Sequence, residues 1–335
     1  MRRALVIAFA IAFAASPAWA ASAWVLPAVY NETTMCASGC DYSNLTTWEV
    51  ATTKNLAGTG EVLTVQAGTY DMRVTISGAT GVTSTCFRAI QGEDPTNRPV
   101  FNYSGTLTAW TAVGVIQVNV YSLDTGYEQY FGVAYLDITE SSTTDGVNAY
   151  GIMFSQGSFL VDGNCKAVGN YVHNINGAGV GLGLGIYAMS TNCKIYNNIS
   201  ANCESMNFGV YQGGTAFYND TSYGGATGFW DQGGASPTAK NCIAEDSTTA
   251  EWDGGSWVKT TCTDDGGVVF VNAAGGDFRL DPTDTAALGQ GTDLSATFDD
   301  DYAGSTRTVP WDIGAWKYTA AAPAGGAWRH VIQLW

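Results

Sequence analysis

The chain has 335 residues, a formal net charge of −16 and a charged-residue content of 13%. So acidic a protein repels nucleic acid phosphates and anionic membrane surfaces, which excludes partners held by attraction to a basic patch. Charged residues make up about a quarter of an average domain, whereas Gly is abundant here with 41 residues. The composition therefore favours a fold of turns and stacked strands over salt-bridged helices.

Residues 1–20 have the pattern of a secretory signal peptide. Two arginines precede an apolar stretch from Ala4 to Ala15, and Ala18-Trp19-Ala20 supplies small residues at the cleavage positions. The stretch is too short to span a membrane as a helix. The sequence therefore predicts a secreted, periplasmic or extracellular protein, cleaved near Ala20, with no membrane span.

Residues 21–58 are predicted to form an N-terminal cap region. The stretch from Ser43 to Leu56 contains a capping-box pattern from Thr46 to Glu49, and it places Leu45 and Trp48 near one face of a short helix. Exposed strand edges promote aggregation, so a helix of this kind is expected to cover the open apolar end of the first coil.

A short motif recurs in the middle of the chain. Asn164-Cys165-Lys166 returns 28 residues later as Asn192-Cys193-Lys194. Self-similarity at such a period is typical of a solenoid, in which stacked coils share one core. Looser copies follow at intervals of about 22 residues, as expected for such a repeat, at Phe217 to Thr221 and Ala239 to Ile243.

A second series of brief apolar segments runs beside the first. Both series are separated by Gly, Asn, Asp and Ser, as strands bounded by turns are, so each coil is predicted to hold at least two strands. A gapless match pairs Asn170 with Asn198, whereas hydrophobic alternation pairs Asn170 with Asn197, and a one-residue bulge would reconcile them. The second series comprises Gly151-Ile152-Met153, Gly185-Ile186-Tyr187, Gly209-Val210-Tyr211 and Gly228-Phe229-Trp230.

The repeated asparagines have a structural explanation. Asn tolerates left-handed backbone conformations at tight turns, and stacked side-chain amides can satisfy one another along a solenoid. The Asn series is therefore interpreted as scaffold and not as catalytic machinery.

The repeats resemble those of the right-handed parallel β-helix proteins of the pectate-lyase-like superfamily. In that family a capping helix leads into a strand and a Gly-Thr-Tyr turn, similar to Leu45 to Glu49 and then Val62 to Tyr70. The resemblance covers about residues 40–318 and implies an all-β, right-handed parallel β-helix over residues 59–318. It specifies no reaction, because one fold hosts many functions. Closing motifs similar to those of many secreted members are Val269 to Asn272, Asp277 to Leu280, Asp293, Gly304 to Arg307 and Trp311 to Ala315.

Residues 319–335 are predicted to be a linker followed by a tail. Residues 319–327 have a linker composition, and the segment ending at Trp335 alternates like a strand. The preferred interpretation is a cap folded back on the last coil. Attachment to another protein is the alternative.

The chain has eight cysteines, an even number, which in an exported protein points first to disulfides. Cys36 and Cys40 are close enough for a local crosslink. Cys165 and Cys193 occupy equivalent places on successive coils, about 4.8 Å apart, within the range that a disulfide spans. Two buried free thiols at these positions are the alternative.

The basic and acidic residues bear on catalysis and metals. A polysaccharide lyase needs a base and a means of neutralising a uronate, and no Arg occurs between Arg98 and Arg279, which leaves Lys194 and His173 as the best candidate bases.

Calcium is a candidate cofactor because acidic residues cluster near the end of the chain. The preferred alternative is a solvated acidic loop in which Arg307 pairs with an aspartate, Asp293 or Asp312. The acidic clusters are Asp264-Asp265, Asp281 with Asp284, and Asp299-Asp300-Asp301.

The second repeat series predicts a carbohydrate-binding surface. If Ile152 and its equivalents point inward, the next residue of each strand points outward and the outward residues stack into a column. Pyranose rings stack on aromatic faces while flanking polar groups fix their orientation. The alternative is an aromatic stack covered by a neighbouring loop. The outward column comprises Met153, Tyr187, Tyr211 and Trp230, with Asp231 and Gln212 beside it.

Three functions are compatible with the sequence. The first is a secreted β-helix that binds a polysaccharide or a cell-surface glycan. The second is an active lyase or glycosidase, and the third is a non-catalytic structural or adhesion protein of the surface. The sequence does not decide whether the protein is an enzyme, since the polygalacturonase signature is absent and no alternative catalytic pair is evident.

Overall fold

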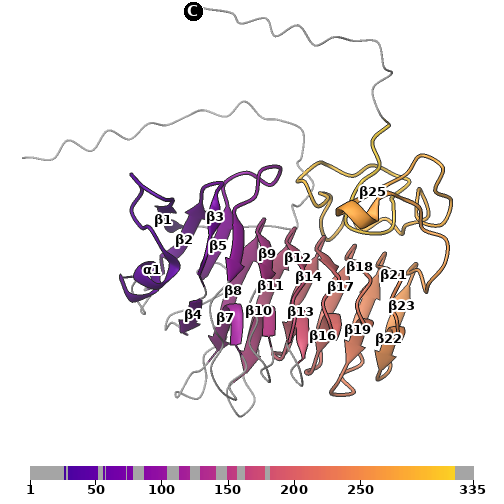
Figure 1. Cartoon of the computed structure of the whole chain (residues 1–335), viewed down its shortest axis with the longest axis horizontal. Helices are drawn as coiled ribbons and strands as arrows, with labels where there is room; N and C mark the ends of the chain where they lie inside the picture. Colours follow the sequence, from indigo (N-terminus) through magenta and orange to yellow (C-terminus); the bar gives the residue numbers. More distant parts are fainter. Residues whose placement is uncertain are drawn as a thin grey trace, which may run out of the picture.

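The chain folds as a right-handed parallel β-helix (Figure 1). Three parallel sheets run along the molecule, and each complete coil, from β2 to β22, adds one strand to each sheet. Right-handed crossovers are the rule between parallel strands of one sheet. The prediction of an all-β parallel β-helix is confirmed. The computed structural model describes residues 26–27, 29–51, 56, 58–72, 74–77, 87–103, 113–120, 129–140, 149–156, 163–177 and 182–320; residues 1–20 and 321–335 lie outside the described residues.

The first sheet has nine strands. They are β1 (Tyr30–Met35), β2 (Gly60–Val65), β5 (Arg88–Gly92), β8 (Gln129–Ala134), β11 (Gly163–Val168), β14 (Lys194–Tyr196), β17 (Ala216–Tyr218), β20 (Thr238–Lys240) and β23 (Val258–Thr260).

The second sheet has seven strands. They are β3 (Thr69–Tyr70), β6 (Val100–Tyr103), β9 (Asp137–Glu140), β12 (Tyr171–His173), β15 (Ile199–Ala201), β18 (Thr221–Tyr223) and β21 (Ile243–Glu245).

The third sheet also has seven strands. They are β4 (Val74–Ser77), β7 (Val113–Val120), β10 (Ala149–Gln156), β13 (Gly183–Ala188), β16 (Met206–Val210), β19 (Thr227–Asp231) and β22 (Ala250–Gly254). Strands β24 (Phe270–Asn272) and β25 (Asp277–Leu280) form a separate antiparallel pair around the short helix η1 (Ala273–Gly275).

The predicted capping helix is present as α1 (Leu45–Ala51), at the N-terminal end of the coils (Figure 1). Leu45 and Trp48 are fully buried, as the sequence predicted. The capping residue differs from the prediction: the Thr47 backbone N–H donates to Asn44 Oδ1 at 2.8 Å, so the helix is capped by Asn44 and not by Thr46. Asn is one of the best N-cap residues because its short side chain accepts from the first free N–H groups.

An amide ladder runs through the buried turns of successive coils. Pairing of β12 with β15 sets Tyr171 beside Ile199, which places Asn170 beside Asn198 and makes the gapless register the correct one, with no bulge between them. Asn170 Nδ2 donates to Asn198 Oδ1 at 3.0 Å, and Asn198 Nδ2 donates to Asp220 Oδ1 at 3.0 Å. The scaffold interpretation is thereby confirmed for these asparagines.

A second set of asparagines forms left-handed turns on the outer side of the coils, where the C-terminal segment buries them. Asn197, Asn219 and Asn241 have φ values of 56°, 54° and 53°, a region that Asn adopts more easily than most residues. Their amides hold the C-terminal segment: Asn219 Nδ2 donates to the Asp312 carbonyl at 3.1 Å, and Asn241 Nδ2 donates to the Thr292 carbonyl at 2.8 Å. That segment therefore packs along the side of the coils. The last strands of the three sheets are β21, β22 and β23.

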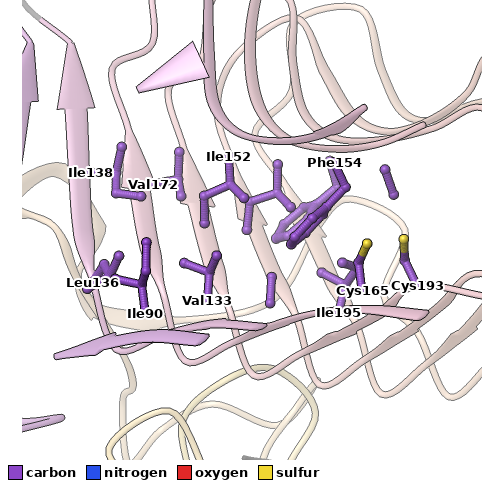
Figure 2. Close-up of a cluster of buried hydrophobic side chains, with 14 of the residues drawn as sticks. Ile90, Val133, Leu136, Ile138, Ile152, Phe154, Cys165, Val172, Cys193 and Ile195 are labelled. Atoms are coloured by element: carbon purple, nitrogen blue, oxygen red, sulfur yellow. The ribbon is translucent and has the colours of Figure 1, made fainter. Parts of the chain in front are cut away.

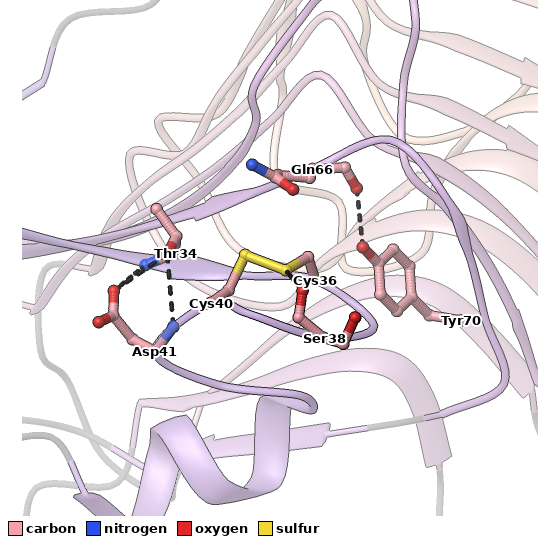
Figure 3. Close-up of a disulfide and its surroundings, with 7 residues drawn as sticks. All are labelled: Thr34, Cys36, Ser38, Cys40, Asp41, Gln66 and Tyr70. Atoms are coloured by element: carbon pink, nitrogen blue, oxygen red, sulfur yellow. Dashed lines mark hydrogen bonds between the residues drawn. A yellow bond between two sulfur atoms is a disulfide. The ribbon is translucent and has the colours of Figure 1, made fainter.

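The two predicted disulfides have different outcomes. Cys36 and Cys40 are bonded, with a Cα–Cα distance of 5.6 Å, so the first prediction is confirmed (Figure 3). Cys165 and Cys193 are buried thiols that lie side by side in the core without a disulfide (Figure 2), so the second is wrong. In-register coils hold equivalent Cβ atoms about 4.8 Å apart, beyond the roughly 3.5 to 4.5 Å that a disulfide needs.

Asn198→Ala should destabilise the protein through the amide ladder. The substitution leaves the buried Asn170 backbone N–H, which donates to Asn198 Oδ1, without its acceptor. A buried donor left unsatisfied costs about 1–3 kcal/mol, and chemical denaturation measures this loss. Gln290→Ala, at an exposed position, is the control and should be nearly neutral; equal stability of the two variants would contradict the ladder's role.

Asp220→Asn should change how stability depends on pH. Asp220 is fully buried, and burial raises the pKa of its carboxyl well above the ordinary value. The folded state therefore retains a proton that the unfolded state releases, so stability is greatest below the ordinary carboxyl pKa and falls as the pH rises towards the raised one. Replacing Asp220 with the neutral amide should flatten this fall in denaturation curves from about pH 4 to about pH 8. An unchanged slope would contradict the assignment.

Candidate functional site at the last coil

The outward column of the third sheet differs from the predicted one. Strand pairing aligns Met153 with Tyr187, Tyr187 with Gly209, and Gly209 with Trp230. Tyr211 follows the end of β16 and lies outside the column, so its predicted place is wrong. The predicted column aligned each glycine-led motif with the next, which placed Tyr187 beside Tyr211. In the structure the pairing of β13 with β16 is shifted by two residues, so Tyr187 lies beside Gly209.

The column is largely covered by its own neighbours. Only 3% of Tyr187 is exposed, and it packs in a cluster with Leu184 and Met206. A Cβ built on Gly209 would lie 2.5 Å from the Tyr187 ring, which shows that this ring occupies the space a side chain would need. Trp230 is half-buried at the edge of the same cluster.

The polar groups beside the column stabilise its turns. The Tyr187 hydroxyl donates to Gln232 Oε1. Asp231 is buried, and its carboxylate accepts from the backbone N–H groups of Ala235, at 2.8 Å, and Ser236, at 3.2 Å. Tyr211, by contrast, is 43% exposed. A carbohydrate-binding role for Tyr187, Tyr211, Trp230 and Asp231 stays a prediction.

A longer aromatic stack runs inside the coils and ends at the surface. Phe208 and Phe229 stack with ring centroids 4.8 Å apart, and Phe229 and Trp252 stack at 4.2 Å, both pairs within 8° of parallel. Trp252 lies on β22, the last strand of its sheet, and is half-buried. The stack therefore presents an indole at the C-terminal end of the solenoid.

Trp252 is held in place by its surroundings. Its Nε1–H donates to the Thr263 carbonyl at 3.1 Å. The Trp257 ring meets it edge-on at a centroid distance of 5.1 Å, and Lys259 Nζ lies 5.0 Å from the centroid of the indole. An indole fixed in this way loses little further freedom when a ligand contacts it.

Charged and polar side chains surround the indole and form a hollow of about 400 Å³. Lys259 Nζ pairs with both carboxylate oxygens of Asp264, at 2.7 and 2.8 Å. Glu251 accepts from Ser247, from the backbone N–H at 2.8 Å and from the hydroxyl at 2.7 Å. We call this feature the end hollow, and its lining is Ser247, Thr249, Ala250, Glu251, Trp252, Lys259, Asp264 and Asp265.

The end hollow was missed by sequence reasoning, although a signal for it exists. The register of β19 and β22 aligns Phe229 with Trp252 and Trp230 with Asp253. Extending the second repeat series by one more coil would have reached this strand. The glycine that introduces each earlier member is replaced there by Glu251, which obscured the repeat.

The two candidate bases do not form a common site. His173 lies on β12, where Nε2 is 3.0 Å from Asp137 Oδ1 and Nδ1 is 2.8 Å from Asn174 Nδ2. Lys194 lies on β14, exposed, in register with Lys166. Burial and the neighbouring Lys194 charge lower the pKa of Lys166. Lys194 and His173 lie on different sheets, and none of these contacts brings them together.

The acidic residues near the C-terminus stabilise turns. Asp284 accepts from three backbone N–H groups, the closest at 2.8 Å, and Asp301 also accepts from three, the closest at 2.7 Å. Arg307 donates to backbone carbonyls, including those of Gly314 and Ala315, so its predicted pairing with the Asp293 or Asp312 carboxylate is wrong. Within the described ranges, no group of three or more His, Cys, Asp and Glu side chains is placed to hold a metal ion.

Comparisons with known proteins add little to these observations. No protein-family model matches the sequence, and no curated protein matches it. A solved structure, pectate lyase Pel9A, is similar with a TM-score of 0.37 and 12% identity, over 71% of this chain and 59% of that chain. Within the part of the chain that the structure describes, no helix is long and apolar enough to cross a membrane. So remote a likeness carries no argument about activity, and the sheet topology itself identifies the chain as a right-handed parallel β-helix protein.

Proposed function

We propose that this protein is an exported β-helix that binds a polysaccharide or cell-surface glycan at the end hollow. The observation that carries the proposal is Trp252, an indole that ends an internal aromatic stack and faces a hollow lined by charged side chains. Ligand sites combine apolar walls with a few placed polar groups and commonly have volumes of about 300–1,000 Å³. The end hollow, at about 400 Å³, lies within this range of volumes, and Trp252 is the aromatic wall of an otherwise mostly polar lining.

The chemistry of the lining suits a sugar. The C–H face of a pyranose ring packs on an aromatic side chain, and its hydroxyl groups both donate and accept hydrogen bonds. Glu251 and Asp264 provide acceptors, and the Lys259 ammonium provides donors, all beside the same indole. Because β22 and β23 end their sheets, the hollow lies at the end of the solenoid.

The ion pair that Lys259 forms with Asp264 favours binding over turnover. A lyase would need an unprotonated base next to the sugar. Lys259 is the lysine of the end hollow, and its ammonium is paired with both oxygens of Asp264. A lysine in such an ion pair is suited to orienting a ligand and not to removing a proton.

Export is supported by two features of the chain. Residues 1–20 have the signal-peptide pattern. The Cys36–Cys40 disulfide fits an oxidising compartment, where such bonds form and persist.

A screen of the purified protein against immobilised neutral, amino and uronate-containing polysaccharides tests the function. We expect retention on at least one polysaccharide, without release of unsaturated product or reducing ends, in the presence or absence of calcium. Calcium-dependent unsaturated product would instead establish a lyase. Absence of binding to every polysaccharide would contradict the proposal.

Substitutions in the end hollow locate the binding site. Trp252→Leu removes the flat indole but keeps an apolar group over Phe229, so affinity should fall by about 1–3 kcal/mol, as for an aromatic anchor. Lys259→Gln should weaken binding by a smaller amount. Isothermal titration with the polysaccharide found in the screen measures both effects.

Val258→Ser is the matched control. Val258 is 55% exposed and adjoins Lys259 on β23, and successive strand residues face opposite sides. The affinity of the Val258→Ser variant for the polysaccharide should equal that of the parent protein. If Val258→Ser weakens binding as much as Trp252→Leu, or if neither hollow variant changes affinity, the site lies elsewhere.

A further inference from the structure

A polar column connects the buried amide ladder to the end of the solenoid. The ladder passes from Asn198 to Asp220 through hydrogen bonds of 2.8 and 3.0 Å. The Ile243 backbone N–H donates to the Asp220 carbonyl, which brings the next coil alongside with Cys242 at the equivalent turn. The Thr263 N–H donates to the Cys242 carbonyl at 3.0 Å, so Cys262 continues the column on the last coil.

The two thiols differ in access to solvent. Cys242 is fully buried, whereas Cys262 is half-buried at the end of the core. Burial raises the pKa of the Cys242 thiol. The neighbouring Cys242 thiol, reinforced by the charge of Lys259, lowers the pKa of Cys262. Reactive cysteines are partly exposed and have a lowered pKa, and Cys262 has both features.

The earlier thiol pair provides an internal comparison. Cys165 and Cys193 also stack on successive coils, but both are fully buried. Their strands β11 and β14 have hydrogen-bonded neighbours on both sides, β8 and β17. Strand β23, which precedes Cys262, has β20 on one side and ends the sheet on the other. Its coil can therefore move the few tenths of an ångström towards Cys242 that disulfide geometry requires.

We propose that Cys242 and Cys262 form a reactive dithiol that a low-molecular-weight disulfide converts to an intramolecular crosslink. The Cys262 thiolate attacks one sulfur of the external disulfide and releases one thiolate, which takes up a proton. Cys242 then loses its proton and attacks Cys262 Sγ, which releases the second thiolate. The two cysteines are oxidised and the external disulfide is reduced to two thiols.

The crosslink has a structural consequence for the last coil. It joins the coil that carries Cys262 to the coil before it, across a closed loop of about 20 residues, and so restricts the unfolded chain. The same coil supplies Lys259 and Asp264 to the end hollow. Oxidation would therefore fix this wall of the hollow to the solenoid.

Treatment of the native full-length protein with oxidised glutathione tests the proposal. Non-reducing peptide mapping should find Cys242 joined to Cys262, while Cys165 and Cys193 remain reduced and react with an alkylating agent only after denaturation. A glutathione adduct that persists on Cys262 in the parent protein would overturn the proposal. So would an unreacted Cys262, or oxidation of the Cys165–Cys193 pair at an equal rate.

Two variants separate the roles of the thiols. In Cys242→Ser the resolving thiol is missing, so Cys262 should accumulate the glutathione adduct. In Cys262→Ser the attacking thiol is missing, and Cys242 should stay unmodified, with a modification rate at least about tenfold lower than that of Cys262 in the parent. Near-ultraviolet circular dichroism of both variants checks folding. Rapid modification of Cys242 in folded Cys262→Ser would contradict the assigned order of attack.

Discussion

In-register stacking of successive coils is the constraint on which the rest of this structure depends. Parallel pairing places each residue beside its equivalent in the next coil, and the same side-chain chemistry then repeats at about 4.8 Å intervals. Asn170, Asn198 and Asp220 are joined by hydrogen bonds because of this spacing, although all three are fully buried. A turn residue that could not form such a ladder would leave buried polar groups without partners.

The same constraint explains where a site can form. A stacked column satisfies its members from both sides except at the last coil, where one side remains unpaired. The aromatic stack that passes through Phe229 therefore presents Trp252, and the polar column presents Cys262, both at the C-terminal end. Up to residue 320, where the description of the chain ends, the C-terminal segment adds no further parallel strand over these residues and packs along the outer asparagine turns. The proposed binding residues and the proposed reactive thiol therefore lie on the last two coils, at the same end of the solenoid.

The sequence predicted the fold because the repeat is a local signal. Turn residues such as Asn219 and the capping face of Leu45 and Trp48 were readable without knowledge of long-range contacts. The residues of the third-sheet column could not all be predicted, because the length of the coils varies. The pairing of β13 with β16 differs by two residues from the predicted register, so Gly209 and not Tyr211 lies beside Tyr187. Trp252 was missed because Glu251 replaces the glycine that leads each earlier member of the second repeat series, so the sequence obscured the repeat that the pairing of β19 with β22 reveals. A short local loop made the Cys36–Cys40 bond predictable, whereas the spacing between coils decided against Cys165–Cys193.

The central claim is that ligand binds at the end of the solenoid and not on its side. Hydrogen–deuterium exchange of the full-length protein, with and without a soluble fragment of the polysaccharide that it retains, tests this most directly. The account predicts that slowed exchange is confined to peptides covering residues 247–265, while peptides covering residues 183–188 and 227–231 are unchanged. Slowed exchange in those two strands, with none at residues 247–265, would contradict it and would place the site on the column of Tyr187 and Trp230.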